Sequence, residues 1–130
     1  MPETLYDTRY FICIYTAKEP SLRRKLKSEL ETRKRRFTSA ITIHEVYRLS
    51  LQDEGREVAK IRRAAIERDF QIINVDPDIA AEAAEIKVAH GSDLPLADAI
   101  IGATAVLHKL DCFTDDNHIR RLAGLRTRWV

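Results

Sequence analysis

Residues 94–107 read LPLADAIIGATAVL and form the longest mainly apolar stretch of the chain. Asp98 and Thr104 interrupt this stretch, which falls short of the ~20 apolar residues that a membrane-spanning helix needs. Pro95 marks a helix start, and residues 95–110 are apolar nearly all round. That pattern predicts a helix buried at the centre of the protein, and we expect no contact with a membrane.

Strand and helix patterns alternate on both sides of this segment. Short strands are expected at residues 4–6, 37–41, 71–75, 112–114 and, as an edge strand, 127–130. Helical segments are expected at residues 9–16, 21–35, 43–55, 57–69, 78–89, 95–110 and 117–122. Strands that alternate with crossover helices form a parallel sheet covered on both faces. We therefore predict an α/β fold: a three-layer α/β/α sandwich whose short central parallel sheet is flanked by helices.

Composition fits one globular domain spanning residues 1–130. The chain has a mass of 15.0 kDa, with 45% hydrophobic and 32% charged residues, which argues against disorder. The N-terminus lacks a basic-then-apolar signal pattern, so we expect a cytoplasmic protein. Cys13 and Cys112 are too far apart in the sequence for a zinc motif, and the four histidines are scattered. We expect structural or surface roles for all six residues.

The net charge of +2 says little about partners, but the arginines are clustered. Arginine outnumbers lysine fifteen to seven, with groups at residues 33–36, 62–63, 120–121 and 126–128. The planar guanidinium group suits phosphate, although solvated helix faces and loops explain such clusters equally well.

Acidic residues follow several of the predicted strands. Asp7 follows the first strand, and Glu45 lies in the first turn of the helix after the second. Asp98 is in the first turn of the buried helix, and Asp115 and Asp116 follow the fourth strand. Ligands of parallel sheets bind at the carboxyl ends of the strands. The topology thus brings carboxylates from four distant segments to one end of the sheet.

Each of these acids also has a structural explanation. Thr42 and Glu45 match a capping box, and Asp116 suits the N-cap of a short helix. The helix dipole favours Asp98, and Asp7 could begin a turn. However, Asp98 lies among apolar residues with no basic residue within a helical turn, and burial of an unpaired carboxylate is costly. A hard divalent cation such as Mg²⁺ relieves the repulsion between clustered carboxylates, so the joint pattern favours a metal site.

Five segments in order carry a resemblance to a known family. They are LYDT at residues 5–8, TSAITIHE at 38–45, VDPDIA at 75–80, LADAIIGATA at 96–105 and FTDD at 113–116. With these segments the chain resembles the PIN domain, a nuclease fold of VapC-type toxins and RNA-processing endonucleases. The resemblance spans almost the whole chain and implies a PIN-like sandwich.

The resemblance also assigns roles to residues. It places the family's acidic quartet, which would hold Mg²⁺ or Mn²⁺ and carry catalysis, at Asp7, Glu45, Asp98 and Asp116. It implies supporting roles for the hydroxyls of Thr8 and Thr114, and the T-x-D spacing selects Asp116 over Asp115. Asp115 and Asp93 remain candidates for supporting roles at the metal site. Asp93 also fits as a residue that marks the start of the helix before Pro95. Arg9 and Ile119 depart from the family pattern, which bears on substrate preference.

The resemblance implies a Mg²⁺- or Mn²⁺-dependent endoribonuclease, with Glu45 either binding metal or orienting the attacking water. RNA is the expected partner, and its backbone would contact Arg9, Arg35, Arg36, Arg120 and Arg121. A homodimer and a small antitoxin partner are also implied. A stripe of leucines fits either a dimer surface or ordinary core packing: Leu22, Leu26 and Leu30.

Three other functions share parts of this pattern. A receiver-type phosphoacceptor would need its acidic pair after the first strand and a lysine after a late strand. A haloacid-dehalogenase-type phosphatase would need a second acid at position 9, where the chain has Arg9. The stronger alternative is a catalytically inactive PIN-like module that binds RNA or protein, and the presence of all four acids argues against it.

Overall fold

Short segments from five parts of the chain form one parallel sheet. The computed structural model describes residues 3–33, 35–91 and 93–130, so Lys34 of the predicted basic cluster and the extreme N-terminus lie outside it. Within these residues the sheet has the order β3-β2-β1-β4-β5, and each neighbouring pair is parallel. The strands are β1 (Thr4–Tyr6), β2 (Arg36–Ser39), β3 (Gln71–Ile73), β4 (Asp111–Phe113) and β5 (Thr127–Arg128).

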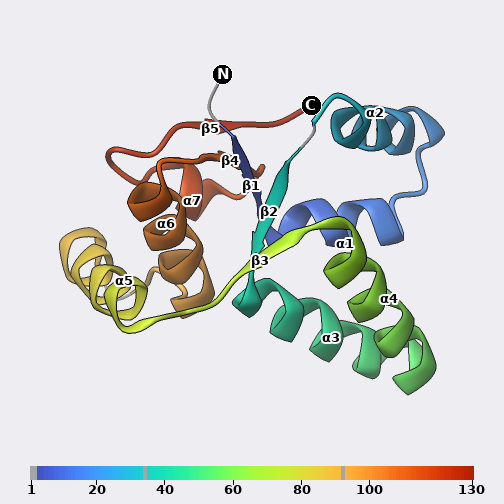
Figure 1. Cartoon of the computed structure of the whole chain (residues 1–130), viewed down its shortest axis with the longest axis horizontal. Coiled ribbons are helices and arrows are strands. Elements are labelled where there is room, and N and C mark those ends of the chain that lie inside the picture. The colour runs from blue at the N-terminus through green and yellow to red at the C-terminus, as the bar shows by residue number, and fades with distance from the viewer. Residues whose placement is uncertain (1–2, 34, 92) are drawn as a thin grey trace.

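Helices cover both faces of this sheet (Figure 1). One face carries α1 (Thr8–Thr16), α2 (Pro20–Glu31), α3 (Ala40–Glu54) and α4 (Arg56–Asp69). The other carries α5 (Pro77–His90), α6 (Leu96–His108) and α7 (Asn117–Arg120). The predicted α/β/α sandwich with a central parallel sheet is confirmed.

Alternating side chains of the strands supply the core on each face. Tyr6 and Phe113 point into an aromatic cluster with helices α1 to α4, in which their ring centroids lie 5.4 Å apart. Their neighbours Leu5 and Cys112 pack instead against the α6 side and are fully buried. Because helices cover both faces, consecutive residues of β1 and β4 are buried on opposite sides of the sheet: Leu5 and Tyr6 in β1, and Cys112 and Phe113 in β4.

Helix α6 is the most buried helix of the described chain, as its apolar sequence predicts. Residues 99–105 are buried without interruption. At Gly102 the helix lies so close to Leu122 that a Cβ atom there would force the end of the Leu122 side chain to shift. None of the helices described is long and apolar enough to cross a membrane.

The boundary between β2 and α3 differs from the prediction. We expected a strand to Ile41 and a helix from Ile43, but the strand ends at Ser39 and the helix begins at Ala40. The Ser39 side chain caps the helix by accepting a hydrogen bond from the Ile41 amide at 3.1 Å. The predicted capping box of Thr42 and Glu45 is therefore wrong, because Thr42 already lies inside the helix.

Other ends shift by a few residues. Helix α2 stops at Glu31 rather than at residue 35, and β3 stops at Ile73 rather than at Val75. The leucine stripe of α2 packs into the core: Leu26 is fully buried, and Leu22 and Leu30 are partly buried against the aromatic cluster. In this chain core packing accounts for that stripe.

Candidate active site

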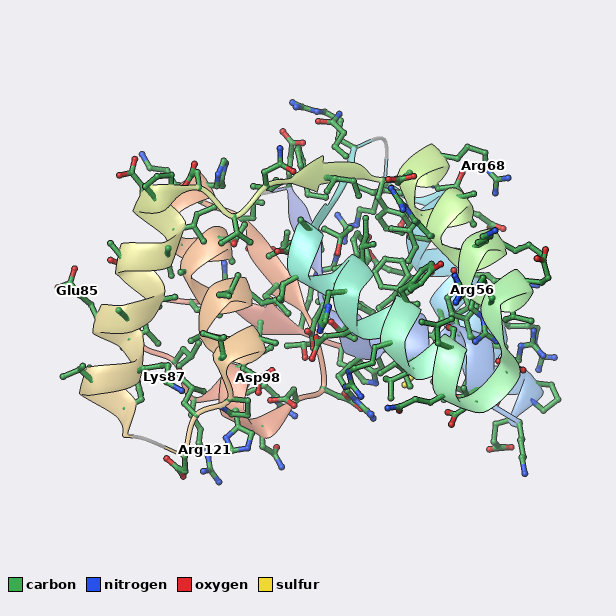
Figure 2. The ribbon with its side chains drawn as sticks, turned by 90° about the horizontal axis from the view of Figure 1, so that it is seen from below. Arg56, Arg68, Glu85, Lys87, Asp98 and Arg121 are labelled. Carbon is green, nitrogen blue, oxygen red and sulfur yellow. The ribbon has the colours of Figure 1, made fainter. Side chains whose placement is uncertain are left out.

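Four segments deliver acidic side chains to the carboxyl-terminal edge of the sheet. Asp7 directly follows β1 and caps α1. Asp116 lies in the segment between β4 and α7 and caps α7. Glu45 lies in α3 and Asp98 in the first turn of α6. Figure 2 views the molecule from below Figure 1, and Asp98 lies on this side.

Asp7 is the most deeply placed of the four, with 2% of its surface exposed. Its Oδ1 accepts a hydrogen bond from the Thr8 amide at 2.7 Å, and its Oδ2 accepts one from the Thr114 hydroxyl at 2.6 Å. Burial raises the pKa of Asp7 to about 6. The hydrogen bonds from Thr114 and Thr8 lower this pKa, and the charge of Asp116 raises it further. Both hydrogen bonds hold the carboxylate in one orientation.

Two threonines, Thr8 and Thr114, connect Asp7 to the neighbouring acids. The Thr8 hydroxyl donates to Glu45 Oε1 at 2.6 Å, which binds α3 to the start of α1. The Thr114 hydroxyl, besides donating to Asp7, accepts the Asp116 amide at 2.9 Å. One continuous network thus runs from Glu45 through Asp7 to Asp116, and the resemblance-based supporting residues Thr8 and Thr114 are its connectors.

Asp116 and Asp98 keep oxygens available for a ligand. Asp116 Oδ1 accepts the amides of His118 at 2.8 Å and Ile119 at 3.2 Å, so the predicted N-cap role is real. The Asp98 side chain is in hydrogen-bond contact with the side chain of Asp116. Burial raises the pKa of Asp98 to about 7, and the charges of Asp116, Asp7 and Glu45 raise it in that order. Because the charges of all three other acids raise this pKa, Asp98 lies close enough to interact with each of them.

The donor chemistry of this cluster fits a hard divalent cation. Mg²⁺ binds oxygen ligands, takes one or two carboxylates and keeps waters or phosphate oxygens, so it needs no complete protein cage. Within residues 3–33, 35–91 and 93–130, however, no group of three or more His, Cys, Asp or Glu side chains is arranged to hold a metal ion. The oxygens left free on Asp98 and Asp116 are the donors that such a cation would find.

Thr42 is the site residue that sequence reasoning missed, having been considered only as a helix cap. Its side chain is fully buried, and its hydroxyl lies 3.1 Å from that of Thr8. The spacing of Thr42 and Glu45, one helical turn apart, was the available signal. This spacing places both side chains on one face of the helix, the face that contacts Thr8. The same spacing also matches a capping box, which is the interpretation that the sequence favoured.

Asp115 and Arg9 form an ion pair beside the cluster. Arg9 Nε donates to Asp115 Oδ1 at 2.9 Å, and Nη2 lies 3.4 Å from Oδ2. Their side chains are 43% and 31% exposed, respectively. Asp115 is therefore paired with Arg9, and the pair connects the start of α1 to the segment after β4.

The other predicted residues do not join the cluster. Asp93 is exposed and lines a small cleft with Arg121, and no hydrogen bond or ion pair of the described chain connects it to the four acids. Arg120 and Arg121 end α7, and Figure 2 shows Arg121 on the same margin as Asp98. Both arginines are exposed, and no hydrogen bond or ion pair of the described residues connects them to the four acids.

Arg35 and Arg36 lie at the opposite edge of the sheet, at the amino end of β2. Arg35 pairs with Glu3 at 3.1 Å and lies over the Phe37 ring at 5.1 Å. Arg36 Nε lies 3.4 Å from the Arg33 carbonyl. The structure therefore does not bring this pair to the carboxylates.

Comparison with known proteins agrees with this geometry. The family model described as PIN domain matches residues 5–125, and the chain belongs to the PIN domain family. No curated protein matches the sequence. Membership of this family supports a nuclease as the class of activity.

Solved structures of similar fold include three toxin systems. VapBC2 from Rickettsia felis, bound to a promoter DNA fragment, has a TM-score of 0.79 at 12% identity and covers 98% of each chain. A toxin–antitoxin complex from Klebsiella pneumoniae has a TM-score of 0.71 at 29% identity, with 95% of each chain covered. VapC20 from Mycobacterium tuberculosis, a sarcin-ricin loop cleaving toxin, has a TM-score of 0.75 at 19% identity, covering 95% of this chain and 99% of that one.

Proposed function

We propose that this protein is a Mg²⁺- or Mn²⁺-dependent endoribonuclease of the toxin type. The observation that supports this most strongly is the meeting of four acids at the carboxyl ends of the strands. Hydrogen bonds of Thr8 and Thr114 connect Glu45, Asp7 and Asp116, and the charges of these three acids raise the pKa of Asp98. Without a cation, this edge would repel a phosphodiester. A bound divalent ion supplies the positive charge that stabilises the scissile phosphate and lowers the pKa of an attacking water.

In this proposal the protein's own residues bind and orient. Asp98 and Asp116 hold the cation through their free oxygens, while Asp7 is fixed by Thr8 and Thr114. Glu45, held by the Thr8 hydroxyl, either joins the ligand set or accepts the proton of the attacking water.

Substrate contacts in this proposal come from cations at the margin of the cluster. Arg9 uses Nε and Nη2 on Asp115, which leaves Nη1 available for a phosphate oxygen. Arg120 and Arg121 supply further charge on the α7 side. Such contacts to the RNA backbone are independent of sequence and sensitive to salt.

Calorimetric titration with Mg²⁺ and Mn²⁺ tests the site before any substrate is known. Wild type is compared with Asp7→Asn and Asp98→Asn, and Asp78→Asn serves as the matched control because Asp78 occupies the first turn of α5. We expect both site variants to lose binding and the control to keep it. Cleavage of mixed RNAs by wild type and control alone would complete the test.

Two other results would count against the proposal. Equal binding by all four proteins would mean that the acids do not form one metal site. RNA binding without cleavage under any metal would support the alternative, an inactive RNA- or protein-binding PIN module.

We also propose a small antitoxin as partner and a homodimer as the assembly. Solved neighbours that are toxin–antitoxin complexes support the first. The second rests on the family resemblance, because the leucine stripe of α2 is occupied in the core. Light scattering of the purified chain, with and without the product of an adjacent reading frame, would test both assemblies.

A further inference from the structure

The positive charge of the chain is concentrated in one segment away from the acidic cluster. Residues 18–36 contain nine of the 22 basic residues but only three of the 20 acidic ones. This segment therefore carries a formal charge of +6, and the rest of the chain carries −4. An asymmetry of this kind indicates a surface for a polyanion.

Helix α2 presents this charge to solvent. Four of its cations are exposed and, within the described part of the chain, form no ion pair: Arg23, Arg24, Lys25 and Lys27. The Arg9, Arg33, Arg35 and Arg128 guanidinium groups, by contrast, are all paired with carboxylates. The α2 cations are therefore available to an external anion.

A groove runs along the same helix. It has a volume of about 570 Å³, and Ser21, Arg24, Lys25, Ser28 and Thr32 line it. Among the described residues, no hydrogen bond engages the Ser21 or Ser28 side chain, so both hydroxyls can donate. Serine, threonine, arginine and lysine are the side chains that contact nucleic-acid phosphates.

Glu29 also lines this groove, but its charge is already compensated. Arg128 Nη1 and Nη2 donate to its two oxygens at 2.7 Å each, and Arg33 Nε donates at 3.1 Å. The carboxylate is held inward by these groups and by the Tyr6 hydroxyl at 2.6 Å. It therefore does not cancel the attraction of the groove for an anion.

The dimensions fit a nucleic-acid strand. From Ser21 to Thr32 the helix rises about 16 Å at ~1.5 Å per residue. Successive phosphates of a stacked strand are about 3.4 Å apart, so the groove covers about three to five of them. A membrane surface fits less well, because an interfacial helix needs an exposed apolar face and the leucines of α2 face the core.

We infer that α2 is an RNA-backbone binding surface separate from the four carboxylates. It binds RNA substrates whose length allows them to contact α2 and the carboxylates at the same time. Helix α1 lies between the two sites: it begins at Asp7 and contacts α2, where the Tyr10 hydroxyl donates to the Leu26 carbonyl at 3.1 Å. This inference rests on the proposed function for the identity of the polyanion. It adds a substrate-length requirement that the acidic cluster alone does not imply.

Binding without chemistry provides the test. The Asp98→Asn protein, in EDTA, is titrated with a labelled RNA of about 30 nucleotides at salt concentrations from about 50 to 200 mM. Arg24→Gln/Lys25→Gln is introduced into this protein, since glutamine keeps the helix propensity. The matched control is Arg56→Gln/Lys60→Gln, which removes the same charge from exposed positions of α4, where Figure 2 labels Arg56.

Each phosphate contact to a single strand contributes about 0.7 to the slope of log K against log salt. Loss of two contacts should lower that slope by about 1.4 and weaken binding about 25-fold at about 0.1 M salt. The control should bind within about 2-fold of its parent. Unchanged binding in the α2 variant, an equal loss in the control, or no RNA binding by the parent would each overturn the inference.

Cleavage assays separate this inference from the proposed function. With Asp98 intact and Mg²⁺ present, Arg24→Gln/Lys25→Gln should cleave the long RNA poorly at low concentration but cleave a tetranucleotide as wild type does. Equal loss on both lengths would overturn the separate-surface inference while leaving the nuclease in place. Weakened binding by the α2 variant without cleavage by any protein would refute the nuclease and leave the surface intact.

Discussion

Replacing Asp98 by Asn should stabilise the metal-free protein while abolishing its metal site. Asp98 is partly buried among three other acids, and its side chain is in hydrogen-bond contact with that of Asp116. Its pKa rises from the ordinary 3.8 to about 7, first through burial and then through the charge of Asp116. Its ionised form is therefore less favourable in the folded chain than in the unfolded one.

The magnitude follows from the two pKa values. Each pKa unit is worth about 1.4 kcal/mol, which sets a ceiling of about 4 kcal/mol for the difference. Because Asp98 retains contact with water, screening reduces this to about 2 kcal/mol. The destabilisation is absent below the unfolded pKa of about 4, grows as the pH rises and is complete above about pH 7.

Urea unfolding in EDTA measures this effect. At about pH 8 we expect Asp98→Asn to raise the free energy of unfolding by about 2 kcal/mol, and near pH 4 the gain should nearly vanish. Saturating Mg²⁺ should stabilise wild type but not the variant. Asp78→Asn, the control in α5, should instead lose about 0.5 kcal/mol of helix-dipole stabilisation.

Two results would refute the reasoning. A variant less stable than wild type at about pH 8 would mean that Asp98 is paired in the folded chain. A gain independent of pH would mean that the asparagine side chain, rather than the lost charge, produces it.

Three further predictions concern the support of the site and the core. Glu29→Gln should cost about 2 kcal/mol near pH 7, since hydrogen bonds from Arg128 and Tyr6 outweigh burial and lower the pKa of Glu29 to about 2. That stabilisation is lost as the pH falls from about 4.5 to 2, so wild type and variant should converge there in urea unfolding, and divergence would contradict it. Thr114→Val should leave Asp7 Oδ2 unpaired, cost about 1–3 kcal/mol and weaken Mn²⁺ binding, whereas Thr114→Ser should restore both; calorimetry that shows no difference between Val and Ser would exclude this role. Ile101→Ala should cost about 2–5 kcal/mol in thermal or urea unfolding because Ile101 is fully buried in α6, and a cost below about 1 kcal/mol would show that the site collapses.

Local sequence patterns were enough to predict the layers of this protein. Alternating strand and helix signals predicted the parallel sheet, because a chain that forms such a sheet must cross over between strands. The apolar sequence around Asp98 predicted α6 and its burial. The sequence also brought the acids to the same edge, since the carboxyl ends of parallel strands share it.

The contacts between those acids were decided by the tertiary structure. The hydrogen bond from Thr114 to Asp7 joins residues 107 positions apart, and the Arg9–Asp115 pair spans 106. No local pattern encodes such pairings, because they depend on the register of β1 and β4 and on where each helix begins. The packing of these elements also decided that Glu45 accepts a hydrogen bond from Thr8 instead of forming a capping box. It placed Arg35 beside Glu3, at the amino-terminal end of the strands. The sequence alone determined the layers of the fold and the end of the sheet where the acids meet. The hydrogen-bond partner of each side chain was decided by tertiary packing, because those partners are far apart in the sequence.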